Sequence, residues 1–163
     1  MTIYFYKVWQ PYGCFSNFSP HGIQMQGTYW PTVEHYYQAQ KFVGSVDAVI
    51  IPIIQAAETP EEAAALGRCH TRQLRSDWEI VKTTVMREAV LKKFLTHLEI
   101  KEILLATGNE TLVENSPNDY FWGCGAEETG QNHLGKILMS VRAEIRQSRV
   151  FTTMPAESSP AKP

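Results

Sequence analysis

The segment from residue 76 to residue 97 constrains the fold most, because it carries the longest helical pattern in the chain. Its first residues, Ser76-Asp77-Trp78-Glu79, match the capping-box pattern that begins many helices. Apolar residues then recur at three- and four-residue steps, at Ile80, Val81, Val85, Met86, Ala89, Val90 and Phe94. A helix of this length with one apolar face has to cover a core, so the sequence predicts a domain built around it.

Helix signals also occur on both sides of this segment. We expect four further helices, over residues 34–42, 59–67, 99–106 and 132–145. Thr32, Thr59 and Asn132 each stand at a position where a side chain can cap the first turn. Gly44 and Gly108 follow two of the segments and favour helix ends there. The last of these helices has an apolar stripe at Leu134, Ile137, Leu138, Val141 and Ile145.

Strand signals are few. Residues 3–8 suit a strand, turn formers follow as far as Gly22, and residues 112–114 suit a second, brief strand. The chain has 163 residues and is 44% hydrophobic, which provides one packed core but is too short for two ordinary domains. The prediction is a predominantly helical α+β single domain over residues 1–149, with a small N-terminal β component and a disordered tail over residues 150–163.

Charge and composition exclude several classes of protein. Lys plus Arg number 15 and Asp plus Glu 17, so the net charge of −2 gives no broad positive field to hold duplex DNA. The longest apolar run, residues 48–54, has seven residues and contains Pro52, far short of the roughly 20 that cross a bilayer. The first residues carry no basic segment or long apolar stretch typical of an export signal. The three cysteines match neither a disulfide framework nor a zinc site, which favours a reducing cytoplasm.

Polar residues gather on one face of the expected helix over residues 34–42. Glu34, Gln38 and Lys41 are spaced by four and three residues, so a helix would project all three groups from one side. The alternative is an ordinary solvated face. His35 in the same segment reads as a structural histidine, because no second ligand stands at metal-binding spacing from it.

A basic segment precedes the longest predicted helix. Arg68, His70, Arg72 and Arg75 fall within eight residues, and guanidinium groups beside a helix start suit phosphate binding. The alternative is a basic surface loop without a ligand. Aromatic residues also lie in or beside the polar segments, where some could stack on a flat base.

Several segments together resemble the NADAR family. The resemblance spans about residues 4–145 and rests on ordered motifs: Phe15-Ser16-Asn17-Phe18, Trp30-Pro31-Thr32-x-Glu34-His35-Tyr36-x-Gln38-Ala39-Gln40-Lys41-Phe42, Arg75-x-Asp77-Trp78-x-x-Val81-Lys82, Lys93-Phe94, Leu104-Leu105-Ala106-Thr107-Gly108, Leu112-Val113-Glu114, Asp119-x-x-Trp122-Gly123 and Asn132-His133-Leu134-Gly135-x-x-Leu138-Met139. The chain departs from the family pattern at Val33, where a small polar residue is usual.

The resemblance implies an N-glycosidase that hydrolyses the bond between a ribose anomeric carbon and a nitrogen. Two substrate classes are associated with the family: ribosylamino-pyrimidine phosphates of riboflavin biosynthesis, and ADP-ribose attached to guanine in nucleic acid, which would require transient contact with modified nucleic acid. Both need a carboxylate near the anomeric carbon and an acid near the leaving group. No cofactor and no metal ion is expected, and the sequence predicts no particular oligomeric state.

The resemblance also implies roles for individual residues. Glu34 and Asp119 match the family's motif carboxylates, for proton transfer, stabilisation of the cationic sugar, orientation of the ribose or activation of water. Lys41 matches its motif lysine, which could attack the anomeric carbon and form a Schiff base. The expected substrate-binding residues are Ser16, Asn17, Phe18, Trp30, Gln38, Arg68, Arg72, Arg75, Trp78, Trp122 and Gly123.

Substrate preference is expected in the loop over residues 125–130, where Glu127 and Glu128 would disfavour a long polyanion. Two other functions compete with the enzyme. One is a non-catalytic module that binds ADP-ribose or a nucleotide, and the other is a structural interaction protein whose aromatic residues form a partner surface. The presence of Glu34, Lys41 and Asp119 together favours the enzyme.

Overall fold

The computed structural model describes residues 1–153, and within this range the chain folds into six α-helices, two short 3-10 helices and two two-stranded sheets. The helices are α1 (Val33–Gln40), α2 (Ile51–Gln55), α3 (Pro60–Gly67), α4 (Trp78–Thr96), α5 (Leu98–Ala106) and α6 (His133–Thr153). The 3-10 helices are η1 (Gly13–Phe15) and η2 (Ala48–Ile50), and the strands are β1 (Thr2–Phe5), β2 (Ile23–Met25), β3 (Thr28–Trp30) and β4 (Thr111–Glu114). The predicted α+β class with mainly helical content is confirmed.

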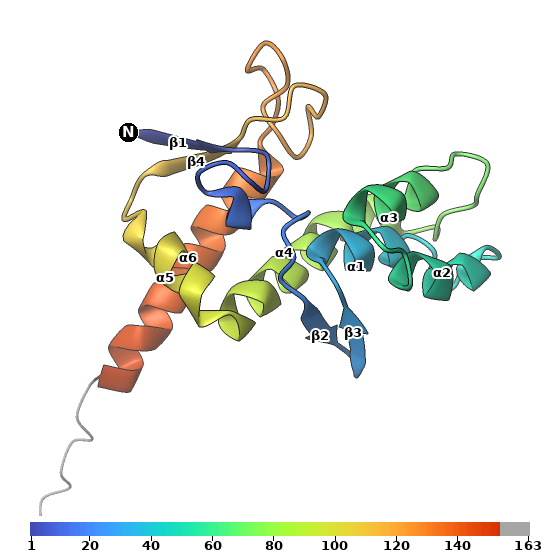
Figure 1. Cartoon of the computed structure of the whole chain (residues 1–163), viewed down its shortest axis with the longest axis horizontal. Helices are drawn as coiled ribbons and strands as arrows, with labels where there is room; N and C mark the ends of the chain where they lie inside the picture. The colour runs from blue at the N-terminus through green and yellow to red at the C-terminus, as the bar shows by residue number, and fades with distance from the viewer. Residues whose placement is uncertain (154–163) are drawn as a thin grey trace, which may run out of the picture.

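The two sheets lie in different parts of the fold (Figure 1). β1 and β4 pair in parallel, with Thr2 opposite Thr111 and Phe5 opposite Glu114. β2 and β3 form an antiparallel hairpin whose turn residues, Gln26 and Gly27, both have positive φ, at 53° and 80°. β4 confirms the brief strand expected over residues 112–114, and it follows five of the six helices in the chain.

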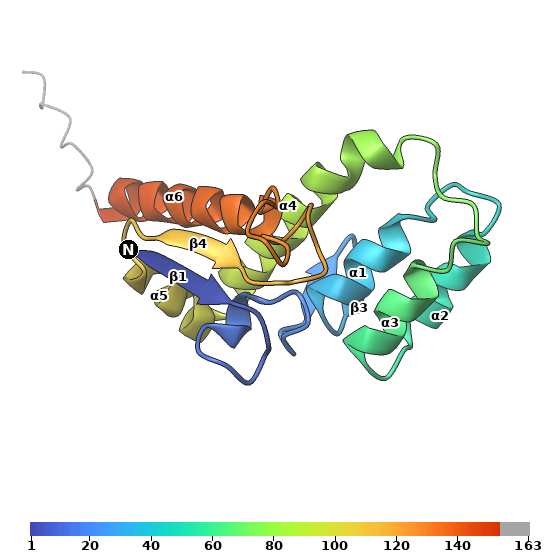
Figure 2. The ribbon, with the colours of Figure 1, turned by 90° about the horizontal axis from the view of Figure 1, so that it is seen from above.

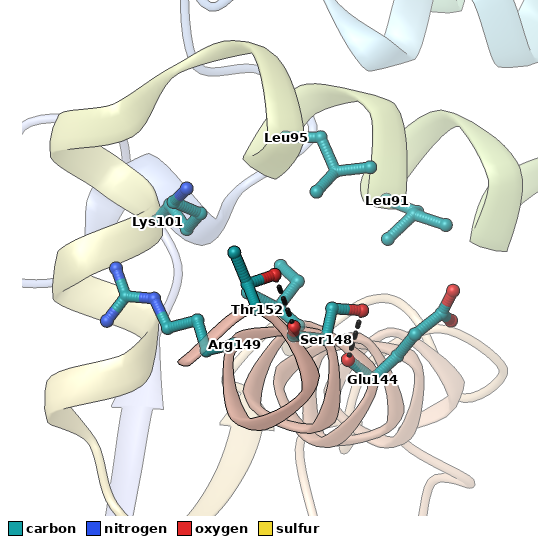
Figure 3. Close-up of a pocket in the computed structure, with 8 residues that line it drawn as sticks. Leu91, Leu95, Lys101, Glu144, Ser148, Arg149 and Thr152 are labelled. Atoms are coloured by element: carbon teal, nitrogen blue, oxygen red, sulfur yellow. Dashed lines mark hydrogen bonds between the residues drawn. The ribbon is translucent and has the colours of Figure 1, made fainter. Parts of the chain in front are cut away.

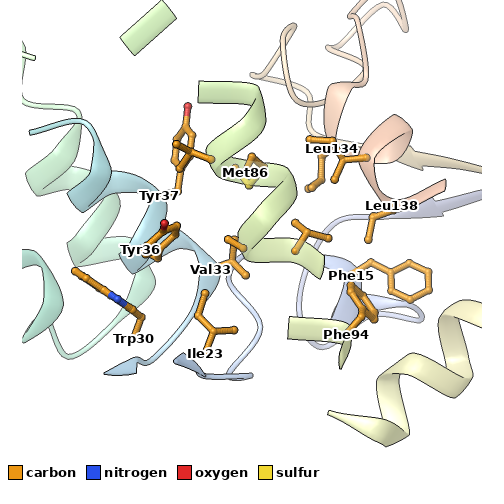
Figure 4. Close-up of a cluster of buried hydrophobic side chains, with 14 of the residues drawn as sticks. Phe15, Ile23, Trp30, Val33, Tyr36, Tyr37, Met86, Phe94, Leu134 and Leu138 are labelled. Carbon is orange, nitrogen blue, oxygen red and sulfur yellow. The ribbon is translucent and has the colours of Figure 1, made fainter. Parts of the chain in front are cut away.

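Helix α4 joins the two halves of the molecule, one formed by α1, α2 and α3 and the other by the β1–β4 pair, α5 and α6 (Figure 2). It contacts α1 and β2 on one side and α5 and α6 on the other, while α1 also packs on α2 and α3. Figure 2 shows α6 running beside the β1–β4 pair, with the α1, α2 and α3 group at the other end. Core side chains from α1, α4 and α6 pack together in one buried cluster, which includes Val33, Met86 and Leu138 (Figure 4).

Of the three caps predicted at Thr32, Thr59 and Asn132, two form. The hydroxyl of Thr32 accepts the backbone N–H of His35 at 3.2 Å, and that of Thr59 accepts the N–H of Glu62 at 3.1 Å. Asn132 precedes α6, but its side chain binds strand β4 instead: Oδ1 accepts the N–H of Glu114 at 3.0 Å, and Nδ2 donates to the Leu112 carbonyl at 2.9 Å. This side chain thereby links the start of α6 to the strand.

The long helix begins differently from the prediction. Asp77, not Ser76, occupies the N-cap of α4, and no side chain caps the helix there. Arg75 instead donates two hydrogen bonds to the carboxylate of Asp77, at 2.6 and 3.0 Å. Ile80, expected on the apolar face, is 82% exposed, whereas Met86 and the other expected residues further along are buried or half-buried.

The last helix is longer than predicted. All five residues of its expected apolar stripe are buried, and α6 continues to Thr153, beyond the expected domain end at residue 149. The remainder of the predicted tail, residues 154–163, lies outside the described residues. Within residues 1–153, no helix is both long enough and apolar enough to cross a membrane.

Candidate active site

A cavity of about 760 Å³ opens between the two halves of the molecule. Six segments line it: the loop after β1, the residues after η1, the inward face of α1, the two ends of α3, the middle of α4, and the end of β4 with the loop that follows it. The lining residues are Tyr6, Lys7, Val8, Trp9, Ser16, Asn17, Phe18, Glu34, Tyr37, Gln38, Lys41, Glu61, Arg68, Met86, Glu114, Ser116, Asn118, Asp119, Tyr120, Phe121 and Trp122. Its volume is in the range of small-molecule sites, about 300–1,000 Å³.

Glu34 lies in the first turn of α1 and is only 5% exposed. Its Oε1 accepts a hydrogen bond from Gln38 Nε2 at 2.7 Å, and Arg68 Nη2 lies 3.7 Å from the same oxygen. Burial raises the pKa of Glu34, while the hydrogen bond from Gln38 and the charges of Arg68 and Lys41 act in the opposite direction. Glu34 is thus a buried carboxyl group with donors directed at its charged form.

Lys41 follows the last residue of α1 and is half-buried. Its Nζ donates to the Gly67 carbonyl at 3.4 Å and lies 5.5 Å from the centre of the Tyr37 ring. Burial lowers the pKa of Lys41 to about 8, against the opposing effect of the Glu34 carboxylate. At pH 7 about one amine in ten is then neutral and nucleophilic.

Asp119 and Trp122 lie in the loop that follows β4. Asp119 Oδ1 accepts the backbone N–H groups of Phe121 and Trp122, at 3.0 and 2.7 Å, so this carboxylate also holds the loop in shape. The Trp122 ring is half-buried and packs edge-on against Tyr37, with ring centroids 5.5 Å apart. The loop therefore presents one carboxylate and one indole to the cavity.

The segment over residues 16–18 forms another wall of the cavity. Asn17 Nδ2 lies 3.3 Å from the sulfur of Met86, and its buried Oδ1 has no hydrogen-bond partner among the described residues. The carbonyl of Ser16 accepts a 2.9 Å hydrogen bond from Lys93, a fully buried residue of α4. These contacts fix the wall and leave one polar atom of Asn17 for a ligand.

The structure brings nine of the fourteen predicted site residues to this cavity: Ser16, Asn17, Phe18, Glu34, Gln38, Lys41, Arg68, Asp119 and Trp122. His35 has the structural role expected of it, because its two ring nitrogens are bonded to Thr32 Oγ1 at 2.8 Å and to the Ala57 carbonyl at 3.0 Å.

Five predicted residues do not line the cavity. Trp30 is 4% exposed and packs on Tyr36 in the core, and Trp78, also 4% exposed, packs behind Tyr37 with ring centroids 5.1 Å apart. Arg72 donates to the Leu66 carbonyl at 3.2 Å, and Arg75 is paired with Asp77.

Gly123 is the fifth of these residues. It is buried within the loop after β4, where an added Cβ would lie 2.9 Å from Ser116 and 3.0 Å from the carbonyl of Asp119. The acidic loop expected to influence substrate preference also lies outside the cavity lining, since Glu127 and Glu128 are exposed and do not line the cavity.

Sequence reasoning assigned no role to several residues that do line the cavity, notably Lys7, Trp9, Tyr37 and Glu114. Trp9 is 78% exposed at the rim, and Lys7 Nζ lies 6.0 Å from the centre of its ring. Glu114 belongs to the family motif Leu112-Val113-Glu114, which is the one sequence signal that points to it. Within residues 1–153, no group of three or more His, Cys, Asp or Glu side chains is arranged to hold a metal ion.

A second cavity of about 510 Å³ lies between α4, α5 and α6 (Figure 3). Leu91 and Leu95 of α4 line one side of it. On the other side the hydroxyls of Ser148 and Thr152 donate to carbonyls of their own helix, at 3.1 and 3.0 Å. It contains none of the predicted site residues, so the first cavity is the candidate active site.

A model of the NADAR domain family matches residues 4–146. The chain belongs to the NADAR family. This family assignment confirms the resemblance drawn from the sequence motifs.

Curated proteins similar to the chain include several named for an activity or pathway. The chain is 80% identical over 146 residues to "N-glycosidase Npun_R5314" of Nostoc punctiforme, covering 90% of this chain and 94% of that protein. It is 50% identical over 157 residues to "Riboflavin biosynthesis protein PYRR, chloroplastic" of Zea mays, covering 88% of this chain but only 25% of the maize protein.

A solved structure has the same fold. "N-glycosidase YbiA" of Escherichia coli is 43% identical to the chain over 143 residues, covering 88% of each. The NMR structure of E. coli YbiA aligns with a TM-score of 0.85 at 39% identity, covering 98% of this chain and 94% of that one.

Proposed function

We propose that the chain hydrolyses a ribose–nitrogen bond in a ribosylamino-pyrimidine phosphate, using Glu34, Lys41 and Asp119 at the 760 Å³ cavity. The general class follows from the family: the chain is an N-glycosidase of the NADAR family, as its relatives with that name indicate. The observation that carries the residue assignment is the convergence of a buried carboxyl, a lysine with a low pKa and a second carboxylate on one cavity.

The chemistry of the bond explains why these groups are needed. Breaking it develops positive charge on the sugar ring and leaves an electron pair on the departing nitrogen. The Glu34 carboxylate stabilises the positive charge, and Gln38 and Arg68 favour its charged form. Asp119 orients the ribose through its remaining oxygen, because Oδ1 is already bonded to the loop backbone.

Lys41 is the attacking group in this proposal. Its neutral amine bonds to the anomeric carbon, and the bond from that carbon to nitrogen breaks, with the electron pair leaving on the nitrogen. The bond from the anomeric carbon to the ring oxygen then breaks, and the ring oxygen takes a proton from the amine, which gives the ring-opened Schiff base. Water then hydrolyses the Schiff base to the free sugar phosphate and restores the amine.

Binding of the substrate involves both walls of the cavity. The unpartnered Oδ1 of Asn17 and the nearby Ser16 suit ribose hydroxyls, while Trp122 and Tyr37 offer aromatic surface for the base. Arg68 is the proposed phosphate contact, because it lines the cavity and its side chain is 63% exposed. Trp9 and Tyr120 at the rim enlarge the aromatic surface.

The names of relatives favour the pyrimidine substrate. The maize relative is named for riboflavin biosynthesis, which supports a phosphorylated ribosyl metabolite. ADP-ribose on guanine is the second substrate class, and it extends the same bond cleavage to nucleic acid. The cytoplasm is the proposed compartment, because Cys14, Cys69 and Cys124 are free thiols and free thiols persist in reducing compartments.

Product release tests the function directly. Purified protein is incubated with a ribosylamino-pyrimidine phosphate or with ADP-ribosylated guanine oligonucleotide, and released ribose 5-phosphate or ADP-ribose is measured by mass spectrometry. Release of ribose phosphate that is lost in Glu34→Gln supports the proposal. Tight binding of either compound without release would instead identify a binding module.

A further inference from the structure

Besides the exposed Glu61, three carboxyl groups line the candidate active site: Glu34, Asp119 and Glu114. Their surroundings differ. Glu34 accepts a hydrogen bond from Gln38, and Asp119 accepts two from the backbone. The Oε2 atom of Glu114 is buried and has no hydrogen-bond partner among the described residues.

A carboxylate oxygen that is buried without a donor is unfavourable, because it loses hydration and gains no hydrogen bond in return. The neutral carboxylic acid avoids most of this penalty. Burial and then the charges of Asp119 and Glu34 raise the pKa of Glu114 to about 8, so at neutral pH the group carries its proton. A protonated carboxyl among carboxylates is the usual form of a general acid.

The backbone of Glu114 is fixed on both sides. It is the last residue of β4 and stands opposite Phe5 of β1. Its N–H donates to Asn132 Oδ1 at 3.0 Å, and its carbonyl accepts the N–H of Cys124 at 2.9 Å. A group held by two elements can deliver a proton from a defined position, as catalysis requires.

We propose that Glu114 is the general acid that protonates the departing nitrogen, an inference that rests on the proposed N-glycosidase function. As the bond from the anomeric carbon breaks, its electron pair stays on the nitrogen, which takes the proton of the Glu114 carboxyl. The Glu114 carboxylate regains a proton from the water that hydrolyses the Lys41 adduct. In this scheme Glu34, which accepts a hydrogen bond from Gln38 and lies 3.7 Å from Arg68, is the carboxyl group that faces the cationic sugar.

Two substrates separate proton delivery from other roles. One is the ribosylamino-pyrimidine phosphate, whose leaving nitrogen needs a proton. The other is 4-nitrophenyl ribofuranoside 5-phosphate, whose nitrophenolate leaves without one. Glu114→Gln keeps the size of the side chain and should lower turnover of the first substrate by a factor of about 10² to 10⁴ while changing the second by less than about tenfold. Glu127→Gln, an exposed change away from the cavity, should leave both rates unchanged.

Infrared difference spectra between the wild type and Glu114→Gln provide a readout that does not depend on activity. Wild-type protein at pH 7 should show the carbonyl band of a protonated carboxyl group, and Glu114→Gln should lack it. Circular dichroism establishes that the variant is folded.

The outcomes that would contradict the Glu114 assignment differ from those that would contradict the proposed function. Equal losses on both substrates, an unchanged rate on the pyrimidine, or the absence of the wild-type band would overturn the assignment of Glu114. Wild-type protein that cleaves neither substrate would contradict the proposed function itself, and the infrared band would then still report the protonation state of Glu114.

Discussion

Gln38 Nε2 donates a 2.7 Å hydrogen bond to Oε1 of Glu34, one turn earlier in α1. Both side chains are almost fully buried, at 1% and 5% exposure, and both line the cavity. The close approach of α3 holds this pair in place, since a Cβ at Gly67 would stand 2.1 Å from Gln38 Oε1. In the proposed mechanism Gln38 is therefore a positioning residue, because its hydrogen bond favours the charged form of Glu34.

Replacing Gln38 should change the pH dependence of the reaction. Gln38→Leu removes a donor that lowers the pKa of Glu34, so the pKa of Glu34 should rise further and a smaller fraction should be charged at neutral pH. We expect turnover to fall by about tenfold or more, and the acidic limb of the rate profile to move to higher pH. Gln40→Leu, on the same helix but outside the cavity lining, is the matched control. An unshifted acidic limb in Gln38→Leu would contradict the positioning role.

Glu34 itself should matter for turnover more than for binding. Glu34→Gln keeps the shape of the side chain but cannot carry the negative charge that faces the sugar. We expect turnover to fall by a factor of about 10² to 10³, the usual scale for losing one group that stabilises charge in the transition state. Substrate affinity, measured by calorimetry on the inactive variant, should stay close to that of the wild type. Turnover like that of the wild type would remove Glu34 from the mechanism.

Lys41 should form a covalent adduct with the sugar. Borohydride reduces a Schiff base to a stable secondary amine, so reduction during turnover should inactivate the protein and add the mass of the ring-opened sugar phosphate. Peptide mapping should locate that mass on Lys41. Lys41→Arg should show neither the adduct nor appreciable activity, because the guanidinium stays protonated. Active protein without any adduct would favour direct attack by water.

Local patterns were sufficient to predict the parts of the site that one helix provides. Thr32 caps α1 as expected, and the spacing of Glu34, Gln38 and Lys41 brings all three to the cavity. The i,i+4 spacing places Gln38 on Glu34 whatever the rest of the fold does. The same reasoning predicted the start of α3 at Thr59.

Long-range packing decided what the sequence could not reveal. Trp30 and Trp78 stand in motifs beside site residues, but other aromatic rings cover them in the core. Glu114 reaches the cavity because β4 pairs in parallel with β1, more than a hundred residues away in the chain. Nothing in the three residues of its motif indicates that pairing.

Long-range packing also decides which arginine of the basic segment reaches the cavity. Of its arginines, only Arg68 lines the cavity, whereas Arg72 bonds the Leu66 carbonyl and Arg75 pairs with Asp77. Arg68→Met should therefore raise KM for a phosphorylated substrate by about tenfold, the scale of a lost charged hydrogen bond. Its effect should shrink on the same substrate without phosphate. Arg72→Met is the control and should leave KM unchanged; an equal rise in both variants would argue against a specific phosphate contact at Arg68.

The buried lysine behind the Ser16 wall should make stability depend on pH. Burial lowers the pKa of Lys93 to about 7 in the folded chain, from an ordinary value of 10.5. Between these two values the unfolded chain binds a proton that the folded chain does not, so the free energy of unfolding should rise with pH across this window. Urea unfolding of the wild type at several pH values from about 7 to about 10 measures that rise.

Lys93→Met isolates the contribution of this one amine. The variant removes the titrating group from the core, so its free energy of unfolding should rise less with pH than that of the wild type over the same window. Other groups titrate there too, which is why the difference between the two proteins is the quantity to compare. Lys92→Met, at the exposed neighbouring position, should retain the wild-type slope. Identical slopes in the wild type and Lys93→Met would mean that Lys93 keeps its ordinary pKa in the fold.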